Sequence, residues 1–225
     1  MISVVLVHYK HESYLWESIQ SIINQTYQDW ELLLMNDDPE TDLKCYARLD
    51  NRITVVNCDK HTGQGTKVNR ALQLARGEFI AMQDADDISM PYRFQVSLDF
   101  LLSNKFDFIY GDMIGLTPEG QRFYVNCQEW NEENILNHRI GGEATQFWKK
   151  SLDVPKLRDG YGKWDPWKLE LFFQDVKADR LPLPLLVYRT WTSNHRKRFQ
   201  MRWKRFQLKR ELRQLYQRLQ DDHQG

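Results

Sequence analysis

The first 110 residues alternate short apolar segments with amphipathic ones, and this alternation limits the fold more than any other feature of the chain. The apolar segments are rich in β-branched and aromatic side chains, as buried strands are. The segments between them repeat their apolar residues every three or four positions, which predicts helices. Such an order predicts an α/β fold with a mostly parallel sheet flanked by helices. The predicted strands are Ile2–Val7, Trp30–Met35, Ile53–Val56, Phe79–Met82 and Phe106–Tyr110, and the predicted helices are Tyr14–Ile23, Thr66–Arg76 and one opened by Pro91.

Polar residues follow three of the predicted strands at the point where each strand ends. They are His8-Tyr9-Lys10, Asn36-Asp37-Asp38 and Asp84-Ala85-Asp86-Asp87. Ligands of open α/β sheets bind outside the carboxyl ends of the strands, so these residues are expected to surround one site. Carboxylates gathered at one edge repel one another unless a cation or hydrogen-bond donors lie among them. The sequence therefore predicts a site for a metal and a polyhydroxyl ligand.

The segment Asp84-Ala85-Asp86-Asp87 has the character of a divalent-cation loop. Mg²⁺ or Mn²⁺ is typically held by one or two carboxylates, and water and substrate phosphates complete its shell. A cation held there neutralises the charge that develops on a departing diphosphate. Solvated turns are also often rich in Asp, but the place directly after a buried strand, with Asp37 nearby, favours the cation site.

The order of motifs along most of residues 1–195 resembles glycosyltransferase family 2, whose members have the GT-A fold and invert the sugar carbon. Each motif is weak alone, and the set together is specific. The similar segments are Ser3–Tyr9, Ser21–Tyr27, Asn36-Asp37, Asn69–Leu72, Ala75–Ala81 followed by Asp84–Asp87, and Leu181–Arg189.

This resemblance implies roles for five residues in binding a nucleotide-sugar, most simply a UDP-sugar. Asp37 would accept the uracil N–H, and Tyr9 would pack against the base. Asp84 would contact the ribose, and Asp86 would bind Mn²⁺ or Mg²⁺. Lys67 falls near an Arg that many relatives direct toward the nucleotide. For Tyr9, an ordinary place in the core is an equally good alternative.

The resemblance also implies the general base, which must remove the proton of the acceptor hydroxyl as the sugar carbon is attacked. The family supplies this base from a Glu-Asp pair ahead of a helix, and the matching residues here are Trp164 and Asp165. Asp165 is therefore the predicted base, although Asp followed by Pro is also a common helix start. Trp191 is a second difference from the family pattern, because relatives often have a His at this position. The nearest histidine that could replace it is His195.

Four tryptophans of the second half are candidates for an acceptor site, since aromatic faces stack on sugar rings. Core packing is the alternative, and it is expected for at least half of them. They are Trp130, Trp148, Trp164 and Trp167.

The last thirty residues differ in charge from the rest of the chain. The whole chain has a net charge of zero, but residues 196–225 carry ten Lys and Arg against three acidic residues, so this tail is +7 and the remainder −7. Residues Arg196–Leu219 are predicted to form one amphipathic helix. The helix suits an anionic membrane surface, where each basic residue contributes about 1 kcal/mol. Lipid-linked acceptors are common in the family, which favours this use.

Two other uses of the tail remain open: self-association through Leu208–Leu219, and covering its own domain. Nucleic-acid binding is not expected, because the body is acidic and carries no known binding motif. Cys45, Cys58 and Cys127 suit neither a disulfide framework nor a zinc site. No apolar segment is long enough to span a bilayer. We therefore expect a cytoplasmic protein that docks on the inner face of the membrane through its tail.

Together these features predict a GT-A-like domain over residues 1–195, with a nucleotide-binding half at 1–112 and an acceptor half at 113–195, followed by the tail at 196–225. The predicted reaction is metal-assisted, inverting transfer of a sugar from a UDP-sugar to a hydroxyl of a saccharide or a lipid-linked acceptor. One alternative is a protein of the same fold that binds nucleotide-sugars without turnover. A nucleotidyltransferase is disfavoured, because Gly63 and Gly65 lack the rest of a phosphate-loop fingerprint.

Overall fold

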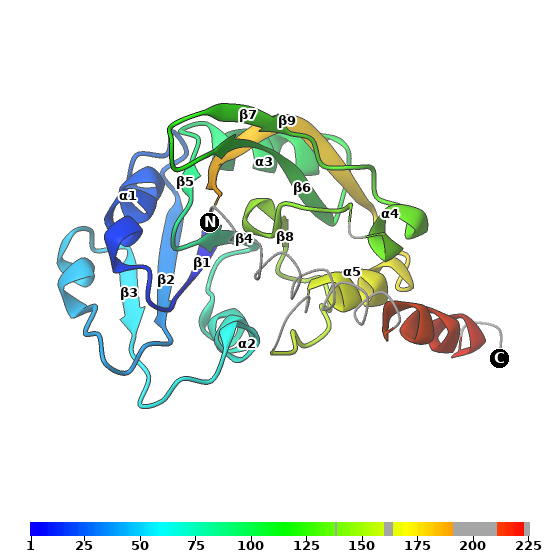
Figure 1. Ribbon diagram of the computed structural model, residues 1–225, viewed down its shortest axis with the longest axis horizontal. Coiled ribbons are helices and arrows are strands. Elements are labelled where there is room, and N and C mark those ends of the chain that lie inside the picture. The colour runs from blue at the N-terminus through cyan, green and yellow to red at the C-terminus, as the bar shows by residue number, and fades with distance from the viewer. Residues whose placement is uncertain (138, 160–163, 191–210, 223–225) are drawn as a thin grey trace.

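The computed structural model describes residues 1–137, 139–159, 164–190 and 211–222. Its first four strands form the predicted parallel array in the order β3-β2-β1-β4. These strands are β1 Ile2–His8, β2 Trp30–Asn36, β3 Ile53–Val56 and β4 Phe79–Asp84, and the helices that accompany them are α1 Glu12–Ile23, α2 Gln64–Leu74 and α3 Arg93–Ser103 (Figure 1).

Helices cover both faces of the sheet, as the alternation predicted. Neighbouring strand residues point to opposite faces: Val4 and Leu6 pack with α1 and α3 in one core cluster, whereas Val5 packs with α2 in the other. Because both faces are covered, β2 is buried along its whole length, and the run Leu32–Met35 within it is continuously apolar rather than alternating.

The second half of the chain extends the same sheet with mixed strand directions. β8 Phe147–Lys149 lies between β4 and β6 Phe108–Leu116, antiparallel to both. β6 is parallel to β9 Ala178–Arg189, and the remaining strands are β5 Ile88–Ser89, paired with β9, and β7 Arg122–Val125, paired with β6. The described residues thus form one nine-stranded sheet, which curls so that β6, β7 and β9 arch across the top of the view (Figure 1).

β6 begins two residues later than predicted and runs further. Phe106 belongs to the turn after α3, since its backbone N–H donates to the carbonyl of Leu101 at a distance of 3.0 Å. The strand continues past Tyr110 with a register shift at Gly111 and Asp112. There the buried carboxylate of Asp112 accepts hydrogen bonds from Arg180, Tyr124 and the backbone N–H of Cys127. A buried carboxylate with three donors thus lies just beyond the predicted end of this strand.

The short helices of the second half are α4 Glu132–Leu136, α5 Trp164–Phe172 and the 3₁₀ turns η1 Lys44–Arg48 and η2 Glu143–Thr145. Residues 211–222 are helical and lie beside α5 (Figure 1). Leu212 and Leu215 of this segment are buried in the core cluster, and the ring of Tyr216 lies 5.4 Å from that of Phe173. This part of the tail therefore covers its own domain. Residues 196–210, which hold most of the basic charge, lie outside the described residues.

Among the helices that the structure describes, none combines the length and the apolar character that a bilayer crossing requires.

Candidate functional site

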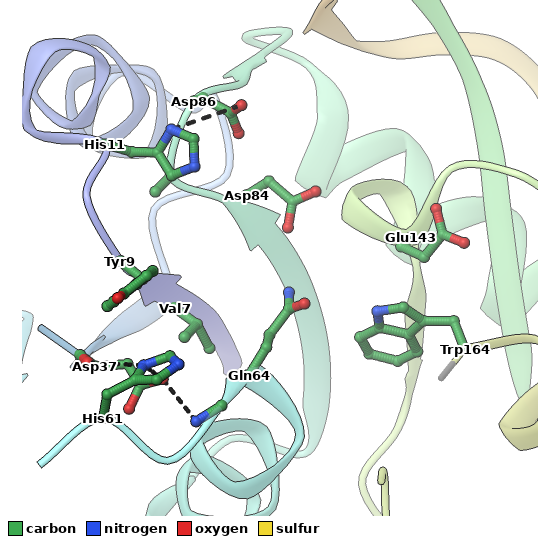
Figure 2. Close-up of a pocket in the computed structure, with 12 residues that line it drawn as sticks. Val7, Tyr9, His11, Asp37, His61, Gln64, Asp84, Asp86, Glu143 and Trp164 are labelled. Atoms are coloured by element: carbon green, nitrogen blue, oxygen red, sulfur yellow. Dashed lines mark hydrogen bonds and ion pairs between the residues drawn. The ribbon is translucent and has the colours of Figure 1, made fainter. Parts of the chain in front are cut away.

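A pocket of about 520 Å³ opens at the carboxyl ends of β1, β2 and β4. The residues that follow these strands supply one side of it, and η2 and α5 supply the other (Figure 2). Of the five carboxylates predicted to gather at this edge, Asp37, Asp84 and Asp86 line the pocket, whereas Asp38 and Asp87 are buried without lining it. The lining residues are Val7, Tyr9, His11, Asp37, His61, Gly63, Gln64, Asp84, Ala85, Asp86, Glu143 and Trp164.

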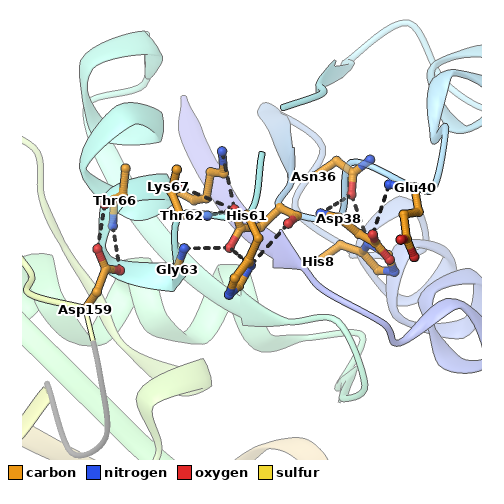
Figure 3. A network of polar contacts seen from close by, with 11 residues as sticks. His8, Asn36, Asp38, Glu40, His61, Thr62, Gly63, Thr66, Lys67 and Asp159 are labelled. Carbon is orange, nitrogen blue, oxygen red and sulfur yellow. Dashed lines mark hydrogen bonds and ion pairs between the residues drawn. The ribbon is translucent and has the colours of Figure 1, made fainter. Parts of the chain in front are cut away.

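Asp37 is held by the loop that precedes α2 (Figure 3). Its Oδ1 accepts the backbone N–H of Thr62 at 2.9 Å, and its Oδ2 accepts that of Gly63 at 2.8 Å. The Nδ1 of His61 lies 2.9 Å from Oδ2, and the ammonium of Lys67 lies 3.4 Å from Oδ1. Burial alone would raise the pKa of Asp37, but these hydrogen bonds and neighbouring charges hold it below its ordinary value.

Tyr9 is a pocket residue rather than a core aromatic. Its side chain is 37% exposed, and its ring stacks on the imidazole of His61 with the centroids 4.1 Å apart. His61 thereby contacts both Tyr9 and Asp37, the two residues predicted to bind a nucleobase. His61 is a site residue that the sequence does not reveal, because its place two residues before Gly63 is the one signal it carries.

The loop of Asp84 and Asp86 is held by three hydrogen bonds, one from Ser18 and two from Arg189. The hydroxyl of Ser18 donates to the carbonyl of Asp84 at 2.9 Å, and the guanidinium of Arg189 donates to the carbonyl of Asp86. The backbone N–H of Arg189 also donates to the carboxylate of Asp87 at 3.1 Å. Asp87 is fully buried, and this burial together with the charges of Asp84 and Asp86 raises its pKa to about 9. The segment Leu181–Arg189, one of the family-like motifs, therefore supports the predicted cation loop through Arg189.

Arg93 is a buried cation beneath this loop. Its guanidinium donates to the side chains of Gln83 and Ser89 at 2.8 Å, and to the carbonyl oxygens of Met82 and Ala144. Burial lowers its pKa to about 10, so it stays charged at neutral pH. Since Met82 belongs to β4 and Ala144 to η2, Arg93 connects the two sides of the pocket.

The opposite side of the pocket carries Glu143 and Trp164 (Figure 2). Glu143 lies 3.2 Å from the ammonium of Lys168, which is fully buried. Asp165 is 4.0 Å from the same ammonium, and it does not line the pocket. Trp164 packs edge-on against Trp167, with the ring centroids 5.4 Å apart.

The structure thus brings Tyr9, Asp37, Asp84 and Asp86 into one pocket. Lys67 and Asp165 do not line it: Lys67 contacts Asp37, and Asp165 contacts the buried Lys168. Core packing accounts for Trp148 and Trp167, and Trp130 packs against Phe108. Trp164 does both, because it is 7% exposed and lines the pocket. Trp191 and His195 lie outside the described residues.

Comparison with known proteins identifies the family. The family model described as Glycosyl transferase family 2 matches residues 3–153. The chain belongs to glycosyltransferase family 2.

Other members of family 2 resemble this chain over most of its length. An uncharacterized glycosyltransferase of Methanocaldococcus jannaschii is 36% identical over 206 residues, which cover 84% of this chain and 70% of the relative. The O-antigen biosynthesis glycosyltransferase WbnJ of Escherichia coli is 31% identical over 213 residues, which cover 88% of this chain and 82% of WbnJ. The chain is thus a transferase of this family.

Solved structures confirm that this family 2 chain has the GT-A-type fold. TarS of S. aureus, residues 1–349 in complex with UDP, superposes with a TM-score of 0.69 at 18% identity, over 84% of this chain and 60% of that chain. The same part of TarS in complex with UDP-GlcNAc superposes with a TM-score of 0.69 over 87% of this chain.

Proposed function

We propose that this family 2 glycosyltransferase moves a sugar from a UDP-sugar to a hydroxyl acceptor, with inversion at the sugar carbon. The observation that carries the proposal is the convergence of Tyr9, Asp37, Asp84 and Asp86 on one pocket at the strand ends. The complexes of TarS with UDP and with UDP-GlcNAc support this class of donor.

In this proposal the donor spans the pocket from Tyr9 to the loop of Asp84 and Asp86. The uracil ring packs on Tyr9, and Asp37 faces its N–H edge. The two oxygens of Asp37 already accept hydrogen bonds from the loop of Thr62 and Gly63, so base binding requires part of this loop to move. The imidazole of His61 stacks on the ring of Tyr9, so it must move before the uracil ring can pack there.

The cation loop fits Mn²⁺ or Mg²⁺ in its donor chemistry. These cations accept one or two carboxylates and complete their shell with water and phosphate oxygens. Asp86 lines the pocket with a side chain 17% exposed, and Asp84 lines it two residues away. Among the described residues no three His, Cys, Asp or Glu side chains are grouped to hold a metal, so the proposed site depends on the phosphates of the donor. A bound cation would neutralise charge on the departing diphosphate.

Calorimetry tests donor binding first. UDP, GDP and their sugars are titrated with and without MnCl₂. We expect UDP compounds to bind, and we expect Asp86→Ala to abolish the gain in affinity from manganese. Asp99→Ala is the matched control, because it makes the same substitution at an exposed carboxylate of α3 that does not line the pocket. If Asp86→Ala binds UDP and manganese as the unaltered chain does, the site is misassigned.

Turnover separates transfer from binding alone. We expect UDP release when UDP-sugars and a panel of sugar and lipid-linked acceptors are supplied together. Asp165 is the base that the family resemblance implies, and Asp165→Asn tests that role. Binding without any release of UDP would favour the alternative, a nucleotide-sugar-binding protein without activity.

The setting of the reaction is part of the proposal. The name of WbnJ places that relative in O-antigen biosynthesis, which suggests a saccharide or lipid-linked acceptor and polysaccharide synthesis at the cytoplasmic face of a membrane. Docking of the basic tail on anionic lipid remains a prediction. Co-sedimentation with phosphatidylglycerol vesicles, weakened by salt and absent with phosphatidylcholine vesicles, is the expected result.

A further inference from the structure

The acidic side chains that the described residues bring to the pocket occupy two separate sides. Asp37 is engaged by the loop before α2, and Asp84 and Asp86 belong to the proposed cation loop. Glu143 stands on the other side, where its side chain is 38% exposed. A base must meet the acceptor away from the nucleotide and the cation, and Glu143 has that position.

Glu143 is presented by a turn whose conformation is fixed by several interactions. Gly142 has a left-handed backbone with φ of 71°. The hydroxyl of Thr145 donates to the carbonyl of Gly142 at 2.6 Å and accepts the backbone N–H of Gly111 at 3.0 Å. Arg93 binds the carbonyl of Ala144 from below at 2.6 Å. Functional side chains need this kind of rigid support, because small displacements weaken catalysis.

Lys168 holds the carboxylate of Glu143 in place. Its ammonium has no exposure to water, so it needs polar partners within the protein. Those partners include the carbonyl of Ile140 at 2.5 Å, the Oε1 of Glu143 at 3.2 Å and the Oδ1 of Asp165 at 4.0 Å. Glu143 and Asp165 therefore share one buried cation, and of the two only Glu143 lines the pocket.

We propose that Glu143 accepts the proton of the acceptor hydroxyl, and that the acceptor is a saccharide that contacts Trp164 where this side chain lines the pocket. This inference rests on the proposed sugar transfer and assigns the base to Glu143 rather than to Asp165. Asp165 acts through Lys168 as a positioning residue.

The step balances in atoms and electrons. The acceptor oxygen forms a bond to the anomeric carbon of the donor sugar while the bond from that carbon to the diphosphate oxygen breaks. The electron pair of the broken bond leaves with UDP. The hydroxyl proton moves to the carboxylate of Glu143, from which water removes it after the product leaves.

The experiment compares Glu143→Gln with Asp165→Asn in the full chain, with UDP release measured in the presence of a UDP-sugar and a panel of methyl glycosides. Both changes keep the side-chain shape and remove the charge. UDP affinity by calorimetry and the thermal unfolding midpoint verify that each variant is folded and binds. Glu143→Ala is assayed with and without sodium formate, which can stand in for a missing carboxylate.

We expect Glu143→Gln to lower kcat by about 100-fold or more, with UDP affinity unchanged, because general bases contribute about 10² to 10⁴ in rate. Asp165→Asn should lower kcat less, and formate should restore part of the activity of Glu143→Ala. The proposal is overturned if Glu143→Gln keeps more than about a third of kcat, or if Asp165→Asn loses as much or more. If the unaltered chain releases no UDP with any pair of substrates, the proposed function fails and this inference fails with it.

Discussion

Replacement of Arg93 by Met should cost a large share of the stability of this protein. The substitution retains a long side chain but removes the donors to four acceptors, among them the buried carbonyl oxygens of Met82 and Ala144. A buried acceptor left without a partner costs about 1–3 kcal/mol. Ser89 still donates to Gln83, so the two carbonyl oxygens dominate the loss. We expect a loss of about 3–5 kcal/mol, out of the roughly 5–15 kcal/mol that natural domains have.

Urea unfolding followed by tryptophan fluorescence measures this loss. With an m-value of about 3 kcal/mol per molar urea, the midpoint should fall by about 1 M or more. Arg93→Lys keeps the charge, but an ammonium has fewer donors than a guanidinium and lacks its planar arrangement. Its loss of stability should therefore lie between those of the unaltered chain and Arg93→Met. Arg48→Met, on the exposed surface of η1, is the matched control and should change stability by less than about 0.5 kcal/mol. If Arg93→Met shifts the midpoint no more than Arg48→Met, the buried guanidinium does not connect the two sides of the pocket as described.

Three further predictions follow from single contacts. Gly142→Ala should destabilise the protein by more than about 2 kcal/mol, because the added Cβ would lie 2.5 Å from the hydroxyl of Thr145. Gly120 also has a positive φ but has open space around it, so Gly120→Ala should cost only about 1–2 kcal/mol in thermal or urea unfolding. Tyr9→Ala should weaken UDP binding by about tenfold in calorimetry, as loss of a stacking partner does, whereas Tyr92→Ala, equally exposed but outside the pocket, should not. Burial would raise the pKa of Asp112, but its hydrogen-bond donors hold this pKa below the ordinary value. The contribution of Asp112 to stability should therefore be present above about pH 4 and be lost as the pH falls through the folded pKa. In urea unfolding, Asp112→Asn should be less stable than the unaltered chain at about pH 7, and its stability should depend less on pH below about pH 4.

The nucleotide half could be predicted from the sequence because its signals are local. The buried strands are mostly apolar, each helix repeats its apolar residues, and the site residues lie at or just after strand ends. Asp37, Asp84 and Asp86 therefore reach one pocket as expected, and the segment Leu181–Arg189 ends in the Arg189 that supports the loop of Asp86.

The acceptor half could not be predicted in the same way, because its geometry depends on contacts between distant residues. β8 has only three residues, too few to show a period, yet it joins β4 to β6. Glu143 depends on a left-handed glycine and on Arg93 of α3, about fifty positions earlier. The pair Gly141-Gly142 is typical of a turn, but nothing in the neighbouring sequence indicates which side chain the turn presents.

The pairing of β9 with β6 bears on how this protein can be divided. The family match ends at residue 153, whereas β9 begins at Ala178 and supplies Arg189 to the loop of Asp86. A fragment cut at the end of the match would leave one side of β6 as an open edge, prone to aggregation, and would lack a support of the cation loop. Domain swaps between relatives should therefore exchange at least residues 1–190 as one piece, since the matched segment is not an independent folding unit.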